Sequence, residues 1–189
     1  MAVKKKKLIF NAPFVLGFAF TCLAVLLIGI LTDGKSNQLL FLVYRAPLDD
    51  PLTYIRFFTH VLGHANWGHL INNMCYFLLL WPMLEERYGA KKLLLIVVLT
   101  ALISGLVNFI FFPETALCGA SGVVFAFILL TSFTSFRSGG IPVTVILVAV
   151  LYLGQQVYEG IFVSDDVSQL SHIIGGLVGA GAGYVWNRR

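Results

Sequence analysis

Long blocks of apolar residues constrain the fold of this chain more than any other feature. Hydrophobic residues make up 58% of its 189 residues and charged residues 12%, whereas a soluble domain is about half apolar and about a quarter charged. Several blocks approach the ~20 residues that a helix needs to cross a bilayer. They run continuously apolar instead of alternating with polar residues, which favours membrane helices over barrel strands. We therefore predict an all-α, polytopic membrane protein.

The apolar blocks divide the chain into six predicted transmembrane helices, which form a single membrane domain over residues 1–189. The predicted spans cover residues 12–31, 69–85, 91–112, 119–136, 141–158 and 169–186. The first block follows a basic start, as in a signal peptide, but it is long for one. No small-residue cleavage site is evident before Asp33. We expect this block to remain as the first span.

Residues 33–68 form the longest connection between predicted spans. Aromatic residues are mixed there with basic and acidic residues, which is typical of a segment that lies in the membrane interface. The same composition suits a loop packed on the ends of the helices, and the two interpretations are compatible. We predict an interfacial loop on the outer side of the membrane.

The basic residues predict the orientation of the helices. If the N-terminus is cytoplasmic, ten of the thirteen basic residues lie on the inner side, as the positive-inside rule requires. The ten are Lys4, Lys5, Lys6, Lys7, Arg87, Lys91, Lys92, Arg137, Arg188 and Arg189, whereas Lys35, Arg45 and Arg56 lie outside. We predict that both termini are cytoplasmic, and the small size favours a bacterial plasma membrane. The net charge of +4 then reflects topology and not nucleic-acid binding.

The cysteines and the first histidines give no sign of a disulfide or of a metal site. Cys22, Cys75 and Cys118 have no paired spacing. Cys118 is a possible nucleophile, but nothing adjacent would lower its pKa. His60 and His64 are four residues apart and could bind a metal, yet no acidic ligand lies nearby. We expect no metal and no other cofactor.

Four polar side chains are predicted to lie at one depth in the membrane. The second, fourth and sixth spans all enter from the outer side. His69 and Asn73 lie in the first turns of the second span and share a helix face. Ser121 lies near the start of the fourth span, and His172 lies about one turn into the sixth. Because polar side chains cost free energy in a bilayer, such a group indicates a functional site.

These residue types can hydrolyse a peptide bond. A neutral imidazole, with a reference pKa of ~6.5, can take the serine proton as the hydroxyl attacks a carbonyl. The resulting oxyanion needs hydrogen-bond donors, which the Asn73 amide, the His69 ring and the Ser121 backbone N–H can supply. No Asp or Glu is placed within the spans to orient His172. We therefore predict a Ser121–His172 dyad instead of a triad.

Glycines surround both members of the predicted dyad. Gly119 and Gly122 flank Ser121 and allow a sharp turn and close approach of backbone. Three further glycines follow His172 at four-residue intervals and form a smooth stripe that lets the sixth span pack closely on a neighbour. They are Gly175, Gly179 and Gly183. If that neighbour is the fourth span, the serine and the histidine meet.

Taken together, these motifs resemble those of the rhomboid intramembrane serine proteases in their minimal six-helix form. The resemblance extends from about Arg56 to Gly179. Its motifs are Gly119-Ala120-Ser121-Gly122, His172 with Gly175 and Gly179, the series His60, His64, His69 and Asn73, and the group Glu85, Arg87 and Gly89. Gly-x-Ser-Gly alone would be a weak signal, whereas the whole set is specific.

The resemblance implies a six-transmembrane-helix rhomboid-like bundle and a role for each matching residue. Ser121 would be the nucleophile and His172 the general base and acid, with His69 and Asn73 as oxyanion donors. His64 would support the site, Arg56 would belong to the interfacial loop, and the fifth span with residues 160–169 would form the substrate gate and cap. His60, Glu85 and Arg87 are expected to be structural.

Two positions depart from the family pattern. Ile55 stands where many members have Trp before the loop arginine. Phe125 stands where many have a Tyr that packs on the catalytic histidine. Phe keeps the ring contact and loses the hydroxyl, so we expect the geometry of the site to survive.

We predict an intramembrane serine endopeptidase that cleaves transmembrane segments of membrane proteins near the outer face. A substrate helix would unwind and enter as a strand between the second and fifth spans, and small residues around the scissile bond would suit the glycine-lined site. Its partners would be transmembrane substrates and the lipid bilayer. The sequence leaves the oligomeric state and the substrate open.

The same residues allow three other interpretations. A lone serine near a helix start is usually a cap, which would be the default for Ser121 taken singly. A small channel or transporter would need polar residues along the full depth, but Thr100 and Asn108 are too sparse to extend a path. An inactive rhomboid-like adaptor is the main alternative, although such a protein is expected to lack the serine or the histidine.

Overall fold

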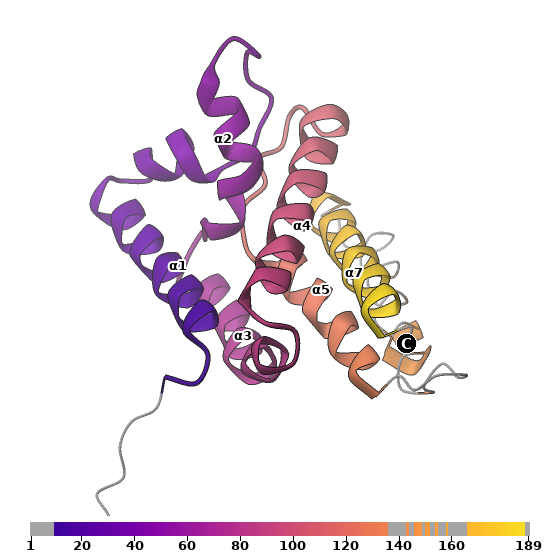
Figure 1. The fold of residues 1–189 in the computed structure, drawn as a ribbon. Coiled ribbons are helices and arrows are strands. Elements are labelled where there is room, and N and C mark those ends of the chain that lie inside the picture. The colour runs from indigo at the N-terminus through magenta and orange to yellow at the C-terminus, as the bar shows by residue number, and fades with distance from the viewer. Residues whose placement is uncertain are drawn as a thin grey trace, which may run out of the picture.

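The computed structural model describes residues 10–135, 143, 146–148, 150, 151, 154, 158 and 166–187. These residues are helical apart from loops and one isolated bridge between Val43 and Leu117. The α-helices are α1 (Pro13–Leu31), α2 (Pro51–Thr59), α3 (Trp67–Tyr88), α4 (Ala90–Phe111), α5 (Ser121–Ser132) and α7 (Asp166–Asn187), arranged as Figure 1 shows. Shorter turns are η1 (Asn37–Phe41), η2 (His60–Leu62) and η3 (Phe133–Ser135).

Helices occupy five of the six segments in which we predicted spans. By length and composition, α1 and α4 are candidate membrane spans. The helices α3 and α7 have 22 residues each and are therefore about 33 Å long, but polar residues lower their hydropathy. The helix α5 is apolar and has 12 residues. The predicted fifth span, 141–158, lies outside the described residues except for scattered positions. Of the predicted cap at 160–169, residues 160–165 also lie outside them, whereas 166–169 form the start of α7 and not a loop.

The boundaries of α3 follow from its caps. The side chain of Asn66 accepts a hydrogen bond from the backbone N–H of His69 (2.9 Å), so the helix begins at Trp67, before the predicted start at 69. Pro82 lies within the helix and removes one backbone donor without ending it. Gly89, with a φ of +79°, ends the helix, and α4 starts at the next residue.

Near its end, α3 also caps α1. The two carboxylate oxygens of Glu85 accept hydrogen bonds from the backbone N–H groups of Phe14 and Val15 (3.0 Å each). These N–H groups lie in the first turn of α1 and have no acceptor within the helix. The negative charge also suits the positive end of the helix dipole. The structural role predicted for Glu85 is confirmed.

The C-terminal end of α7 lies at this same end of the bundle (Figure 1). Asn187 Oδ1 accepts a hydrogen bond from Arg87 Nη2 (2.9 Å). Its Nδ2 donates to the Tyr88 hydroxyl and to the Gly183 carbonyl (2.8 Å each). The start of α1, the α3–α4 turn and the end of α7 therefore meet. We call this the inner end, after its predicted orientation, and the opposite one the outer end.

Among the described helices, α5 and α7 form the most extensive contact. A methyl group at Gly175 would overlap the carbonyl of Gly122, and one at Gly179 would overlap the carbonyl of Ala126. The two backbones are thus in direct contact along the predicted glycine stripe. The predicted pairing of the sixth segment with the fourth is confirmed.

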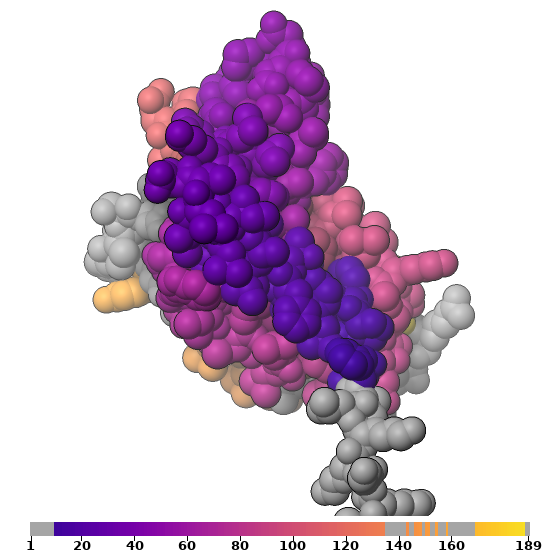
Figure 2. Space-filling model, turned by 90° about the vertical axis from the view of Figure 1, so that its left-hand side faces the viewer, coloured from indigo at the N-terminus to yellow at the C-terminus, as the bar shows by residue number. Residues whose placement is uncertain are grey.

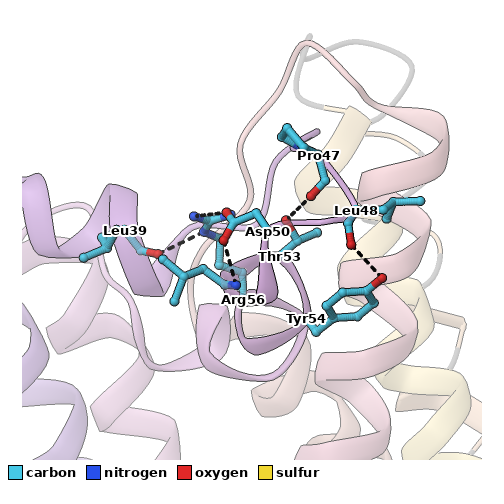
Figure 3. Close-up of polar contacts among 8 residues, drawn as sticks. Leu39, Pro47, Leu48, Asp50, Thr53, Tyr54 and Arg56 are labelled. Atoms are coloured by element: carbon cyan, nitrogen blue, oxygen red, sulfur yellow. Dashed lines mark hydrogen bonds and ion pairs between the residues drawn. The ribbon is translucent and has the colours of Figure 1, made fainter.

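Residues 37–62 fold into a compact unit on the outer end of the bundle. Arg56, 3% exposed, holds this unit together. Its guanidinium contacts the carboxylate of Asp50 (3.2 Å) and donates to the Leu39 carbonyl (2.9 Å), as Figure 3 shows. The ring of Phe57 packs edge-on against Phe109 of α4, with centroids 5.4 Å apart. The loop predicted at 33–68 is therefore packed on a helix end, and its position in the membrane interface stays a prediction.

Large aromatic rings fill the centre of the bundle. The ring centroids of Phe77 and Trp81 on α3 lie 3.8 Å apart, and Phe127 of α5 lies 4.0 Å from Trp81. All three side chains are buried. Figure 2 shows that α1 runs obliquely across one face of the molecule, with the unit around α2 above it. The core thus fixes α3 against α5, the two helices that carry Asn73 and Ser121.

Candidate active site

Ser121 and His172 meet at the outer ends of α5 and α7. The Nε2 atom of His172 lies 2.8 Å from Ser121 Oγ. The two residues are 51 positions apart in the sequence and are brought together by the contact of the two backbones. A hydroxyl within hydrogen-bond distance of an imidazole nitrogen is the arrangement of a nucleophile and its general base. The structure therefore joins the two residues predicted to form a dyad.

The turn before Ser121 needs glycine at position 119. Gly119 has a φ of +122°, which residues with a Cβ rarely adopt. A Cβ there would lie 2.6 Å from the ring of His69. The Gly119 N–H donates to the carbonyl of His60 (2.9 Å). The His69 ring thus packs directly on the turn that presents the serine.

Gly122 keeps α7 close on the other side of the serine. A Cβ at Gly122 would lie 2.9 Å from Ser171 Oγ, the residue before His172. Gly175, one turn further on, contacts the Gly122 backbone. Because no side chain separates the two helices here, the distance between the dyad atoms is set by contact of backbone with backbone.

Asn73 is held by His64. The carbonyl of Leu62 lies 3.1 Å from His64 Nδ1 and can only accept, so Nδ1 carries the proton. His64 Nε2 then accepts a hydrogen bond from Asn73 Nδ2 (3.0 Å). Burial, with a smaller effect of neighbouring His69, lowers the pKa of His64 to about 4. A neutral His64 therefore orients the amide of Asn73 and leaves its second N–H available.

His60 has a structural position. Its Nε2 donates to the carbonyl of Ala101 (3.0 Å), and its side chain is buried. Burial lowers its pKa to about 4. The extended backbone of Gly63 separates it from His64, so the two rings do not share a helix face. Among the described residues no three His, Cys, Asp or Glu side chains form a group that could hold a metal ion.

Phe125 supports the ring of His172. The two ring centroids lie 4.4 Å apart with the planes inclined at 47°. Phe125 follows Ser121 by four residues, so both lie on the same face of α5. The ring contact expected for a family tyrosine is therefore kept by phenylalanine.

A cavity of about 370 Å³ lies beside Ser121. Its walls come from α3, from α5 and from two described residues of the predicted fifth span. They are Asn72, Asn73, Tyr76, Ser121, Val124, Phe125, Ile128, Val148 and Leu151. The sequence interpretation missed Tyr76 and Ile128, although helical spacing from Asn73 and Ser121 could have indicated them. The cavity can hold a side chain of a peptide whose carbonyl lies at the serine.

Cys118 is a poor nucleophile. Burial raises the pKa of its thiol to about 11. The thiolate is the reactive form, so the thiol is protonated and unreactive near neutral pH. Its position in the structure agrees with the preference for Ser121.

Comparison with known proteins identifies the family. The family model for the Rhomboid domain matches residues 51–189, which include every residue of the site described above. This chain belongs to the rhomboid family. Rhomboid proteins are polytopic helical membrane proteins, and the family includes membrane-embedded proteases.

Similar proteins come from an animal and from bacteria. Rhomboid-related protein 2 of Mus musculus is 30% identical over 72% of this chain and 52% of its own length. Rhomboid protease GlpG of Klebsiella pneumoniae is 32% identical over 60% of this chain and 41% of its own length. GlpG of Haemophilus influenzae is 30% identical over 56% and 55%. The chain thus spans about half the length of these relatives. The activities given in their names are those of the relatives.

Proposed function

We propose that this rhomboid-family chain is an intramembrane serine endopeptidase that uses a Ser121–His172 dyad. The observation that carries the proposal is the 2.8 Å contact between Ser121 Oγ and His172 Nε2 at the edge of a cavity. The names of the bacterial relatives, rhomboid proteases, support the same class of reaction. The substrates are transmembrane segments of other membrane proteins.

In the first step, His172 acts as a base. Its Nε2 accepts the proton from Ser121 Oγ as the oxygen attacks the scissile carbonyl, and a tetrahedral oxyanion forms. The imidazolium then gives this proton to the leaving nitrogen as the C–N bond breaks. The products are a free amine and an acyl ester on Ser121. Water attacks the ester in the second half of the reaction, with His172 again as base, and releases the acid.

Three donors can stabilise the oxyanion. Ser121 is the first residue of α5, so its backbone N–H has no acceptor within the helix. Asn73 lines the cavity beside Ser121, and its amide can donate a second N–H. The ring of His69 packs on Gly119, two residues before the serine. Preorganised donors in a site shielded from water lower the barrier of acyl transfer strongly.

The cavity indicates how the substrate reaches the serine. Its walls include Tyr76 of α3 and, from the predicted fifth span, Val148 and Leu151, so it lies between the two segments where we expect the substrate to enter. A substrate strand entering there would place a side chain against Val124 and Ile128. We expect small residues at the scissile bond to be cleaved fastest. A panel of reporters that differ there in residue size tests this, and equal rates across the panel would contradict it.

We also propose six spans with both termini in the cytoplasm of a bacterium. The positive-inside distribution supports this orientation, as does the position of the start of α1 and the end of α7 at one end of the bundle. Reporter domains fused to the C-terminus test it. A phosphatase that is active only on the outer side of the membrane should be inactive when it is fused to the C-terminus. Phosphatase activity of this fusion would contradict the proposed orientation.

Cleavage of a transmembrane reporter by the purified protein tests the dyad. We expect Ser121→Ala and His172→Ala to abolish cleavage. The matched control is Ser132→Ala, which should cleave normally. This serine lies on the same helix, and its hydroxyl donates to the Ile128 carbonyl (3.2 Å). Retained cleavage in Ser121→Ala would refute the nucleophile. An inactive but well-folded wild type, unlabelled by a fluorophosphonate at Ser121, would favour the adaptor function.

A further inference from the structure

Two cations lie on aromatic rings at the inner end of the bundle. The Nζ atom of Lys92 lies 5.0 Å from the ring centroid of Trp186 and 5.8 Å from that of Tyr88. The guanidinium of Arg87 lies 5.5 Å from the Tyr88 ring. The two rings are 5.5 Å apart. We call these four residues, Arg87, Tyr88, Lys92 and Trp186, the basic–aromatic cluster.

Within the described residues, no carboxylate pairs with the positive charges of this cluster. The nearby carboxylate of Glu85 is occupied by the N–H groups of Phe14 and Val15. Arg87 uses one N–H on the neutral amide of Asn187. A ring face attracts a cation without using its N–H groups, so both side chains keep donors for an anion.

An apolar groove of about 280 Å³ begins at the same place. It runs between α4 and α7 and has Trp186 at its inner end. Leu95 and Leu99 line it on α4, where they share a helix face with Lys92. On α7 its walls include Leu177 and Val185, each 64% exposed. We call it the α4–α7 groove.

The dimensions of the groove match one leaflet of a bilayer. From Trp186 to Leu177 the helix rises about 13 Å, close to half of the ~30 Å hydrocarbon core. Gly181 lies midway, and a Cβ built there would meet nothing within 4 Å. The missing side chain deepens the groove at its centre. Tyr and Trp at one end of such a groove mark the level of the head groups.

We propose that the basic–aromatic cluster and the α4–α7 groove bind one anionic phospholipid of the inner leaflet. Lys92 and Arg87 hold its phosphate, and one acyl chain lies in the groove between Leu99 and Leu177. Basic pockets between transmembrane helices on the cytoplasmic side are suited to such head groups. The inference rests on the orientation given under the proposed function and is independent of the dyad.

The experiment measures lipid binding by native mass spectrometry of the detergent-solubilised protein. Phosphatidylglycerol and phosphatidylcholine with identical acyl chains are the probes. We expect one phosphatidylglycerol to bind more tightly than phosphatidylcholine. Lys92→Gln should weaken phosphatidylglycerol binding about five-fold, as expected for the loss of one basic residue near a membrane surface. Lys91→Gln is the control, because Lys91 is also exposed, whereas the cations that lie over the Tyr88 and Trp186 rings in the described structure are Arg87 and Lys92.

A second pair of variants tests the groove. Gly181→Leu adds an apolar side chain to the groove at a position where a built Cβ meets nothing within 4 Å, and it should weaken binding of both lipids. Gly17→Leu is the control, since Gly17 is an exposed glycine of α1 that also has nothing within 4 Å of a built Cβ. These four positions are exposed, so the variants should fold.

Three results would overturn the inference. They are equal binding of the two lipids by the wild type, equal effects of Lys92→Gln and Lys91→Gln, and unchanged binding in Gly181→Leu. A change of oligomeric state in Gly181→Leu, with lipid binding unaltered, would assign the groove to a second copy of the chain. Repeating the series in Ser121→Ala separates the result from proteolysis, because the inactive protein should bind lipid normally.

Discussion

The two ends of the helix bundle contain similar polar residues but differ in how completely the hydrogen-bonding groups of these residues are paired. At the inner end, Asn187 bonds through both its oxygen and its nitrogen, to Arg87, Tyr88 and Gly183. Among the described residues, Asn73 at the outer end bonds only to His64, and it lines the cavity beside Ser121. Asn187 therefore links helices at the inner end, whereas Asn73 can donate to a ligand at the outer end.

This difference separates structural from chemical roles. A buried polar group with all its partners in place stabilises a fold. A group held rigidly by one partner, with another donor directed at a cavity, can stabilise charge that develops during a reaction. Polar side chains are rare in membrane spans, so the sequence alone marks each of them as a candidate functional residue. The number of hydrogen-bond partners in the structure distinguishes a structural role from a chemical one.

The largest effect should come from exchanging the two asparagines for alanine. We expect Asn73→Ala to lower kcat about 100- to 1,000-fold, because an oxyanion donor is lost, with little change in thermal stability. Asn187→Ala should instead cost about 1–3 kcal/mol of stability, with kcat per folded molecule close to that of the wild type. Reporter cleavage and thermal unfolding of the same preparations provide the measurements. The reverse pattern would refute the assigned roles.

Acid should weaken the outer end selectively. His60 and His64 are neutral when folded, with pKa values of about 4, and would take up protons near pH 6.5 when unfolded. Their contribution to stability is therefore complete above pH 6.5 and is lost as the pH falls toward 4, at about 3 kcal/mol for each ring.

Unfolding measured between pH 7.5 and 4.5 checks this loss. His64→Gln should reduce the slope of stability against pH. Asn187→Ala should lower stability at every pH and leave the slope unchanged, because no histidine lies at the inner end. An equal slope in His64→Gln and the wild type would show that His64 does not titrate as expected.

The glycine stripe of α7 should be less tolerant at the outer end than at the inner end. A Cβ at Gly175 would meet the backbone carbonyl of Gly122, whereas one at Gly183 would meet the ring of Phe133, which can rotate. We expect Gly175→Ala to cost about 1–3 kcal/mol and to reduce cleavage by separating the dyad. Gly183→Ala should cost less and keep activity. Thermal unfolding and cleavage assays compare them, and equal losses would contradict the backbone-contact explanation.

The smallest effect should follow Phe125→Tyr at the outer end. The ring contact with His172 would remain and a hydroxyl would be added, so we expect kcat to change less than about ten-fold, or ~1.4 kcal/mol. Phe125→Ala removes the ring and should reduce kcat further. Steady-state cleavage of one reporter by the three proteins gives the comparison. A larger loss in the tyrosine variant than in the alanine variant would exclude a packing role for Phe125.

Features that depend on spacing along one helix could be predicted from the sequence. The stripe of Gly175 and Gly179 indicated that α7 packs closely on a neighbour, and the contact between Ser121 and His172 follows from choosing α5. His69 and Asn73 were assigned to one face for the same reason. The contact of Phe125 with the histidine ring was instead expected from the resemblance to rhomboid proteases, many of which have a tyrosine at this position.

Contacts between distant segments could not be predicted in this way. The capping of α1 by Glu85 joins residues about seventy positions apart, and no local pattern specifies it. The bond from the Gly119 N–H to the His60 carbonyl involves backbone atoms, which are the same in every residue.

The end of α5 at Ser132 also differed from the predicted 136. The side chains of Thr131 and Ser132 bond back to carbonyls of their own helix, and a tighter turn follows.

The contact of α5 with α7 limits which substitutions this protein can accept. Gly175 and Gly122 have no side chains, so the spacing of the two helices at this contact cannot be altered in small steps by exchanging one side chain for another. The alignment of Ser121 and His172 is therefore hard to change gradually. The cavity wall is different, because Tyr76, Ile128 and Val148 are side chains that can be exchanged without touching that contact. A library of variants at these three positions could change which substrate is preferred, while Ser121 and His172 remain aligned.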